Sequence, residues 1–421
     1  MNERSVSVNG ISIYSLTNPN LRSFCLSLYV RAGSIFEDLS NNGISHLFEH
    51  VVFRNIKNKY ENFYELLAMH GLCFQGSTYK KFVSFTIDGP QHEFDFAIEI
   101  LCGLFDEIKL TSHDFNNEKG RIKAEIREKD RRSSLDFYFD SIVWKNSEVE
   151  KIVLGYCKTI DRVSVKKINE FRQKVLSAGN CFVYATGNIS DENLDALNKK
   201  ISELDISQSN PGFTNTVTVN NEFFHREKKI WIKNNYWHYI QIGFDVDCSK
   251  YPGGVYDLLY ALLFNGDKAL VYNYLSEDNP IIYSYDSAFA QYDNVGNINF
   301  SFEVDRNKIE DVFKTVVELL NAAKDGRFNF EANLNYEMFN WELDLDKPSN
   351  LNWNMAYYNH ILKTEPIDYS DEFYGRFRVT KKQVTDAAKD IFRRCNMTVA
   401  MMGNKKKINT DAIEKILESL D

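Results

Sequence analysis

Three residues able to bind a metal and move protons lie within five positions: His46, Glu49 and His50. In a helix, positions i, i+3 and i+4 share one face, so the three side chains would project together. Two neutral imidazoles can bind zinc, while the carboxylate between them can reach a water that zinc has acidified. The order His-x-x-Glu-His places the base before the second ligand. This spacing predicts a hydrolytic zinc site.

A catalytic zinc usually has three protein ligands and one open position, so a third ligand is expected further along the chain. Residues 112–127 are typical of a helix that begins near Ser112. Glu118 and Glu125 lie seven positions apart in it and share one face. Their spacing does not show which of the two glutamates would be the third ligand. The alternative is that both belong to a solvated, charged face that continues to residue 132.

The elements that position these residues show an internal repeat. Residues 163–188 align without gaps with residues 379–404, and each copy predicts a helix followed by a strand. Ser164 and Thr380 are the expected N-caps. Residues 24–31 and 238–246 are two further matching strand candidates, and each precedes a helical run.

This repeat predicts two homologous α+β domains. Residues 207–215 have the composition of a linker. We therefore expect a zinc-binding domain over residues 1–210 and a homologous domain without a metal site over residues 220–421. The length of 421 residues agrees with more than one domain.

Composition narrows the class of protein. The chain is 43% hydrophobic and 26% charged, which is typical of a globular protein with a large core. Its net charge of -9 argues against nucleic acid as a partner. The seven cysteines form no Cys-x-x-Cys pair, so neither a disulfide framework nor a cysteine metal site is indicated. With no leader-like start and no apolar run long enough for a membrane span, we expect a cytoplasmic protein.

Residues 31–54, from the strand to the zinc motif, resemble the signature segment of the pitrilysin, insulin-degrading and mitochondrial processing peptidase family, whose members are inverzincin zinc peptidases. Glu118 and Glu125 resemble that family's downstream glutamate pair. The resemblance implies that Glu125 is the third ligand of one Zn²⁺ per chain and that Glu118 is a supporting carboxylate. It implies that Glu49 is the base that activates water.

The resemblance also implies a fold and a way of binding substrate. Each domain would be a mostly antiparallel sheet packed with helices, and the chain would pair with a second chain to form a clamshell chamber. Residues 71–85 look like the family's strand that pairs with extended peptide, and they imply that Gln75, Gly76 and Ser77 bind substrate. The family's usual Asn-Ala pair is Gln75-Gly76 here. For Phe74, Phe82 and Phe85 we expect a core-facing role.

The second half departs further from the family pattern. Its histidines, His225, His238 and His360, have no metal-ligand spacing. Tyr283 matches a family Tyr that helps to stabilise the oxyanion, but Ser276 stands where an Arg is expected. The missing Arg favours a heterodimer in which a homologous subunit supplies the Arg and Tyr. A homodimer that tolerates serine is the alternative.

The expected function is therefore that of a zinc metalloendopeptidase, which hydrolyses small unfolded peptides as the zinc-bearing subunit of a dimer. Two alternatives stay open. The chain could be a non-catalytic structural subunit of the same fold. It could also be a maturation protease dedicated to one modified bacterial peptide.

Overall fold

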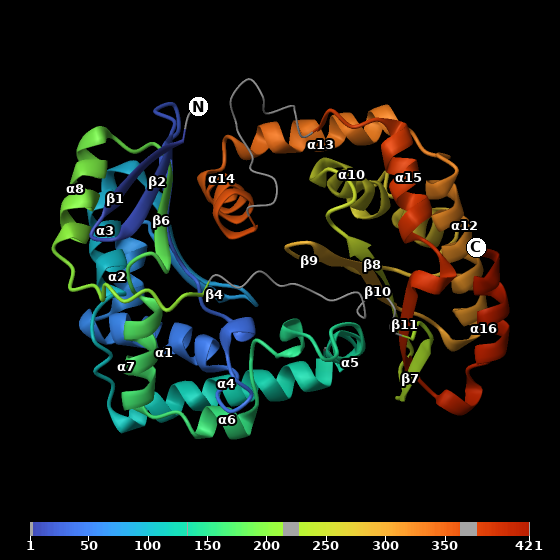
Figure 1. Ribbon diagram of the computed structural model, residues 1–421, viewed down its shortest axis with the longest axis horizontal. Coiled ribbons are helices and arrows are strands. Elements are labelled where there is room, and N and C mark those ends of the chain that lie inside the picture. Colours follow the sequence, from blue (N-terminus) through green and yellow to red (C-terminus); the bar gives the residue numbers. More distant parts are fainter. Residues whose placement is uncertain (1–2, 133, 214–226, 363–376, 421) are drawn as a thin grey trace.

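The computed structural model describes residues 3–132, 134–213, 227–362 and 377–420. It contains two β-sheets that lie in opposite halves of the molecule, with helices on their outer faces (Figure 1). Each sheet has its own buried apolar core between strands and outer helices. The α+β prediction with two similar halves is confirmed. Three parts of the sequence prediction lie outside the described residues. They are His225, residues 214–215 of the expected linker and residues 220–226 at the start of the expected second domain.

Sheet 1 is built from the N-terminal half and has the strand order β1-β2-β6-β3-β5-β4. All neighbours in it are antiparallel except the parallel pair β2 and β6. Its strands are β1 (Arg4–Val8), β2 (Ile11–Thr17), β3 (Ser23–Val30), β4 (Cys73–Thr78), β5 (Val83–Pro90) and β6 (Cys181–Gly187).

Sheet 2 repeats the order of β2 to β6 in the C-terminal half, and no strand equivalent to β1 is found among the described residues. Its order is β7-β11-β8-β10-β9, and the parallel pair is β7 with β11. Its strands are β7 (Ile230–Asn234), β8 (Tyr239–Asp247), β9 (Asp286–Tyr292), β10 (Val295–Glu303) and β11 (Met397–Gly403). The edge strand β4 of sheet 1 therefore corresponds to β9 of sheet 2.

The internal repeat appears in the structure with its register intact. Helix α7 (Val165–Val175) precedes β6 as helix α15 (Lys381–Ile391) precedes β11. Ser164 and Thr380 accept the expected N-cap hydrogen bonds from Lys167 N and Gln383 N. The amide of Asn180 donates to Val175 O and Arg31 O, and the amide of Asn396 donates to Ile391 O and Asp245 O. An asparagine at the equivalent position of each copy thus connects the end of the helix to the sheet by hydrogen bonds.

The remaining helices cover the sheets and connect the two halves. In the N-terminal half they are α1 (Ile44–Lys59), α2 (Phe63–Met69), α3 (Phe94–Gly103), α4 (Ser112–Arg132), α5 (Ser134–Val143), α6 (Cys157–Asp161) and α8 (Asp191–Ser202). In the C-terminal half they are α10 (Gly253–Phe264), α11 (Leu270–Tyr272), α12 (Ile309–Lys324), α13 (Phe330–Asp344), α14 (Pro348–Met355) and α16 (Thr410–Leu417).

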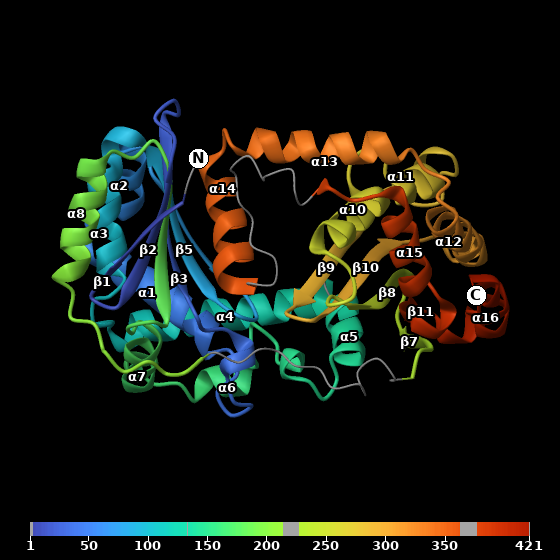
Figure 2. The ribbon, with the colours of Figure 1, turned by 45° about the horizontal axis from the view of Figure 1, so that its top comes forward.

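A helix from each half packs on the inner face of the other half's sheet: α14 on sheet 1 and α5 on sheet 2. Helix α14 comes from the C-terminal half but packs on sheet 1 (Figures 1 and 2). Asn352 of α14 is 1% exposed, accepts a hydrogen bond from Tyr29 Oη and donates to Tyr184 O at 2.9 Å each. This helix is therefore joined to sheet 1 by buried polar contacts as well as by apolar packing.

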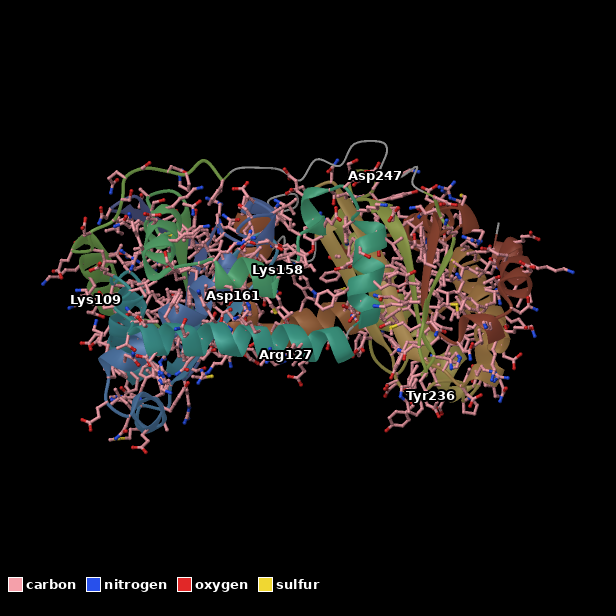
Figure 3. The ribbon with its side chains drawn as sticks, turned by 90° about the horizontal axis from the view of Figure 1, so that it is seen from below. Lys109, Arg127, Lys158, Asp161, Tyr236 and Asp247 are labelled. Carbon is pink, nitrogen blue, oxygen red and sulfur yellow. The ribbon has the colours of Figure 1, made fainter. Side chains whose placement is uncertain are left out.

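Helix α5 makes the reciprocal crossing. Helix α4 runs from the N-terminal half towards the C-terminal half, with Arg127 near its far end, and α5 then lies across sheet 2 (Figure 3). Phe139 of α5 packs where Gly243 of β8 has no side chain, because a Cβ at Gly243 would lie 2.4 Å from Cζ of Phe139. The turn between β4 and β5 also contacts the turn between β9 and β10, since Lys81 Nζ donates to Asp293 Oδ1 at 2.7 Å. Nothing in the periodicity of either half predicts this exchange.

The segment 71–85 forms a hairpin of two strands, so its interpretation as one strand was wrong. Tyr79 N donates to Phe82 O at 2.8 Å, which closes the turn between β4 and β5. Phe74, Phe82 and Phe85 are all buried, as expected. Phe82 belongs to the apolar cluster under α14, whereas the other two belong to the core of sheet 1. Among the described strands, β4 is the last one at this edge of the sheet.

Asp140 on α5 is expected to make the stability of the protein depend on pH. Burial raises the pKa of its carboxyl to about 6, Lys80 opposes this rise, and Asp136 adds to it. Because its pKa is raised in the folded state, the protonated carboxyl contributes to the stability of the fold. This contribution is fully present below the ordinary pKa of 3.8 and is lost as the pH rises through about 6. We expect Asp140→Asn to raise the free energy of unfolding by about 2 kcal/mol at pH 8 and by less than about 1 kcal/mol at pH 4.5.

Urea unfolding at the two pH values measures this effect. The exposed Asp195 on α8 supplies the matched control, and Asp195→Asn should change the unfolding midpoint little at either pH. A stabilisation by Asp140→Asn that is equal at pH 4.5 and pH 8 would contradict the prediction.

Candidate metal centre and adjoining pocket

Helix α1 carries the zinc motif, and a buried carboxylate fixes where this helix begins. Glu37 is 4% exposed. Its side chain accepts hydrogen bonds from Gly43 N at 2.7 Å, from Ser45 N at 2.8 Å and from the Asn42 amide at 2.7 Å. These contacts satisfy backbone N–H groups that the first turn of a helix leaves unpaired. His46 lies one residue beyond Ser45, so Glu37 sets the position of the first candidate ligand.

We expect Glu37→Ala to lower the free energy of unfolding by about 3 kcal/mol, because it leaves several buried donors without an acceptor. Chemical denaturation measures this change. Asp38→Ala is the matched control, since Asp38 is the next residue and is exposed. Equal effects of the two substitutions would show that Glu37 does not hold the start of α1.

The structure brings His46, His50 and Glu125 together. Their candidate ligand atoms all lie within 4.8 Å of one another. Glu125 Oε2 lies 3.6 Å from His46 Nε2, and Glu125 Oε1 lies 3.6 Å from His50 Nε2. The two imidazoles come from consecutive turns of α1, and the carboxylate comes from the neighbouring helix α4. Within the described part of the chain, no second group of this kind is found.

These separations fit a shared metal ion. Ligand atoms about 2.1 Å from one tetrahedral zinc are about 3.4 Å from each other. The observed 3.6 Å is close to that value and longer than an ordinary hydrogen bond. Two imidazole nitrogens and one carboxylate are also a donor set that zinc prefers. The residues present therefore fit a zinc ion.

Glu118 occupies a different place from Glu125. Its side chain is 3% exposed, and Oε2 lies 3.6 Å from His50 Nδ1, the ring nitrogen opposite the one that faces Glu125. It also lies beside two cations, with Arg121 Nη1 at 3.5 Å and Arg54 Nη1 at 3.9 Å. A carboxylate at the second nitrogen of a metal-binding imidazole fixes the orientation of the ring.

Glu49 lies beside the same cluster and touches the edge strand β4. Glu49 Oε2 accepts a hydrogen bond from Thr78 Oγ1 at 2.9 Å and lies 3.9 Å from His46 Nε2. A Cβ at Gly76 would lie only 2.7 Å from Glu49 Oε1. Gly76 and Thr78 are two positions apart on a strand and so share a face. Gly76 was predicted from the sequence as a site residue and Thr78 was not, although this two-residue period could have indicated it.

Burial and the neighbouring charges shift the pKa values of Glu49 and His50. Burial raises the pKa of Glu49 and Glu125 adds to this, while His50 and Thr78 oppose it. Burial by itself would lower the pKa of His50, but Glu118, Glu49 and Glu125 outweigh it and raise that pKa. A general base is most effective when its pKa is closer to neutrality than that of a free carboxylate.

Comparison with known proteins identifies the family. The family model described as Insulinase (Peptidase family M16) matches residues 13–155, and the model described as Peptidase M16 inactive domain matches residues 162–332. The chain belongs to peptidase family M16. The three candidate metal ligands of this M16 chain all lie within residues 13–155, the region that the insulinase model matches.

Named relatives of this M16 chain include proteases. The uncharacterized zinc protease YmxG of Bacillus subtilis is 21% identical over 332 residues, which cover 77% of this chain and 79% of that protein. The β subunit of the mitochondrial-processing peptidase of Saccharomyces cerevisiae is 24% identical over 190 residues, which cover 44% of this chain and 41% of that protein. A protease from Helicobacter pylori has the same fold, with a TM-score of 0.83 at 18% identity over 96% of this chain and 99% of that one.

The residues expected to bind substrate in the M16 chain lie in two separate places. Gln75, Gly76 and Ser77 are all on the edge strand β4, and the first two line a pocket next to Glu49. Tyr283 lies between residues 273–277, which include Ser276, and strand β9. It is 96% exposed and does not line that pocket. Within a single chain, then, Tyr283 is not brought to the candidate centre.

The seven cysteines are all free thiols. None of the helices in the described residues is long and apolar enough to cross a lipid bilayer.

Proposed function

We propose that the chain is a zinc metalloendopeptidase that binds one Zn²⁺ through His46, His50 and Glu125. The convergence of these three side chains, with Glu49 beside them, is the observation that carries this proposal. When bound, zinc supplies a Lewis acid that polarises a peptide carbonyl and acidifies water. The name zinc protease given to relatives supports the same reaction.

Glu49 is the general base in this proposal. Thr78 holds its Oε2, which leaves Oε1, the atom next to Gly76, to receive a proton from the attacking water. The same carboxyl then gives that proton to the leaving amine. Glu118 acts on the opposite side of the cluster, where it orients the ring of His50.

Substrate peptide is proposed to bind as an added strand along β4. This strand lies at the edge of sheet 1, and an edge strand offers unpaired backbone groups to an extended peptide. Gln75, Gly76 and Ser77 lie on it, and Gly76 adjoins Glu49. Main-chain pairing of this kind selects unfolded segments and leaves sequence preference to the pockets nearby.

We further propose that the enzyme works as a dimer in the cytoplasm. A second chain would close the clamshell chamber and bring a Tyr, at the position of Tyr283, to the centre. Because Ser276 cannot supply a fixed positive charge, a homologous subunit that carries an Arg is the favoured partner, and a homodimer is the alternative. The relative named as a subunit of the mitochondrial-processing peptidase gives a precedent for subunits within the family.

Elemental analysis of the purified chain, together with cleavage of an unstructured fluorogenic peptide, tests the proposal. About one zinc per chain and turnover would support a self-sufficient peptidase. Zinc without turnover would favour an obligate heterodimer, to be tested by adding a homologous subunit that carries the Arg. A chain that takes up no zinc would overturn the proposal and favour a non-catalytic structural subunit. Cleavage confined to one modified peptide would favour a dedicated maturation protease.

A further inference from the structure

A pocket of about 350 Å³ adjoins the candidate centre. Glu49 and His50 form its inner end, β4 forms one wall, and helices α1, α2 and α4 form the others. Any peptide that lies along β4 with a bond next to Glu49 would place the side chain beside that bond in or near this pocket. The chemistry of the pocket lining therefore bears on which residue is accepted there.

The outer part of the lining is cationic. Lys57 of α1 and Arg121 of α4 both line the pocket. Among the residues that the structure describes, Lys57 forms no ion pair with a carboxylate, and its Nζ lies 4.5 Å from the ring centroid of Tyr64. Such a contact holds the ammonium in place without using it as a hydrogen-bond donor to an acid. The side chain of Arg121 is 58% exposed, and its Nη1 lies 3.5 Å from Glu118.

The inner charges of the pocket are already balanced. Arg54 is paired with Asp114 at 2.6 Å and lies 3.9 Å from Glu118. Glu118 in turn faces His50, so its charge is shared among buried neighbours. Among the described residues, Glu49 and Glu118 are the carboxylates that line the pocket. Glu118 is thus shared by Arg121, Arg54 and His50, and Lys57 has no carboxylate partner among the described residues. The outer part of the lining therefore carries an excess of positive charge, in a protein whose net charge is -9.

We infer that this pocket selects a carboxylate on the substrate residue next to the cleaved bond. This inference rests on the proposed peptidase function and adds a substrate class to it. Phe53 and Tyr64 would contact the stem of the side chain, and Lys57 with Arg121 would meet its charge. The carboxylate can come from a Glu or Asp side chain or from the C-terminus of a short peptide, since the chemistry is shared.

Binding of labelled peptides to the full chain in its Glu49→Gln form, loaded with zinc, tests this inference without turnover. Four peptides that differ at one position separate the cases. They carry Glu, Leu or Lys there with an amidated end, or Leu with a free C-terminal carboxylate directly after it. We expect the Glu peptide to bind about tenfold more tightly than the Leu peptide, with the Lys peptide weakest. Tighter binding of the carboxylate-ended peptide alone would identify the C-terminus as the source.

Charge reversal gives the second arm of the test. In Lys57→Glu/Arg121→Glu, we expect the order of Kd values for the Glu and Lys peptides to invert. The matched control is Lys199→Glu/Lys406→Glu, which makes the same change in net charge at two exposed lysines that do not line the pocket, and it should keep the wild-type order. Zinc content is measured on every variant, so that loss of the centre is separated from loss of preference.

The outcomes distinguish this inference from the proposed function. Equal affinity for all four peptides, the carboxylate-ended one included, or no measurable binding of any of them, would overturn the inference. Wild-type chain that binds zinc and cleaves all of these peptides equally would do so too, while leaving the proposed function standing. A chain that binds no zinc would instead remove the proposed function on which the inference rests.

Discussion

Replacement of Glu49 by Gln is expected to reduce peptide cleavage by about a thousandfold while zinc stays bound. The amide keeps the size of the side chain but cannot take a proton, and general-base catalysis contributes roughly 10² to 10⁴ in rate. Glu49 lies at the edge of the cluster, with Thr78 bonded to one of its oxygens. Loss of the carboxylate therefore removes the base without removing a proposed ligand.

Steady-state cleavage of a fluorogenic peptide and elemental analysis of the same preparation measure both parts of this prediction. Glu61→Gln is the matched control, because Glu61 is exposed just beyond the end of α1. Retention of more than a tenth of the wild-type kcat by Glu49→Gln would rule out Glu49 as the base. A parallel loss of zinc would instead point to a role for Glu49 in binding the metal.

The second large effect separates the two glutamates of α4. We expect Glu125→Gln to lower zinc from about one per chain to a small fraction, because a neutral amide is a much weaker ligand than a carboxylate. Glu118→Gln should keep zinc at saturating metal and weaken its affinity by about 10- to 100-fold, as expected of a group that orients a ligand. The reason lies in their positions, since Glu125 faces both imidazoles and Glu118 faces the far nitrogen of His50.

Competition with a chelator, followed by elemental analysis, gives the two affinities. Glu107→Gln is the control, since the Glu107 side chain is 62% exposed and lies outside the cluster. The opposite result, in which Glu118→Gln empties the centre and Glu125→Gln keeps it, would exchange the two roles.

Apolar periodicity and helix caps in the sequence predicted individual helices and strands of the fold. The repeat placed α7 before β6 and α15 before β11, because apolar periodicity and N-caps are encoded within about 25 residues. The segment 71–85 was misjudged because its turn at residues 79–82 contains none of the glycine or proline that usually marks a hairpin.

In the candidate site, too, some residues could be predicted from local sequence and others could not. The spacing of His46, Glu49 and His50 on one helix was sufficient to place them together, because helical geometry fixes it. The choice between Glu118 and Glu125 needed more than spacing, since it depends on how α4 crosses α1. Glu37 and Thr78 could not be found from the zinc motif, because their contacts with it come from a loop and from a separate strand.

The exchange of α14 and α5 between the halves has a consequence for how the protein is made. Synthesis proceeds from the N-terminus, and domains generally fold as they emerge from the ribosome. All described strands of sheet 1 have been synthesised once β6 is made. The apolar face around Tyr29 and Tyr184, however, stays uncovered until α14 is synthesised, more than 150 residues later. The N-terminal half should therefore be a client of chaperones during translation, and expressed alone it should aggregate.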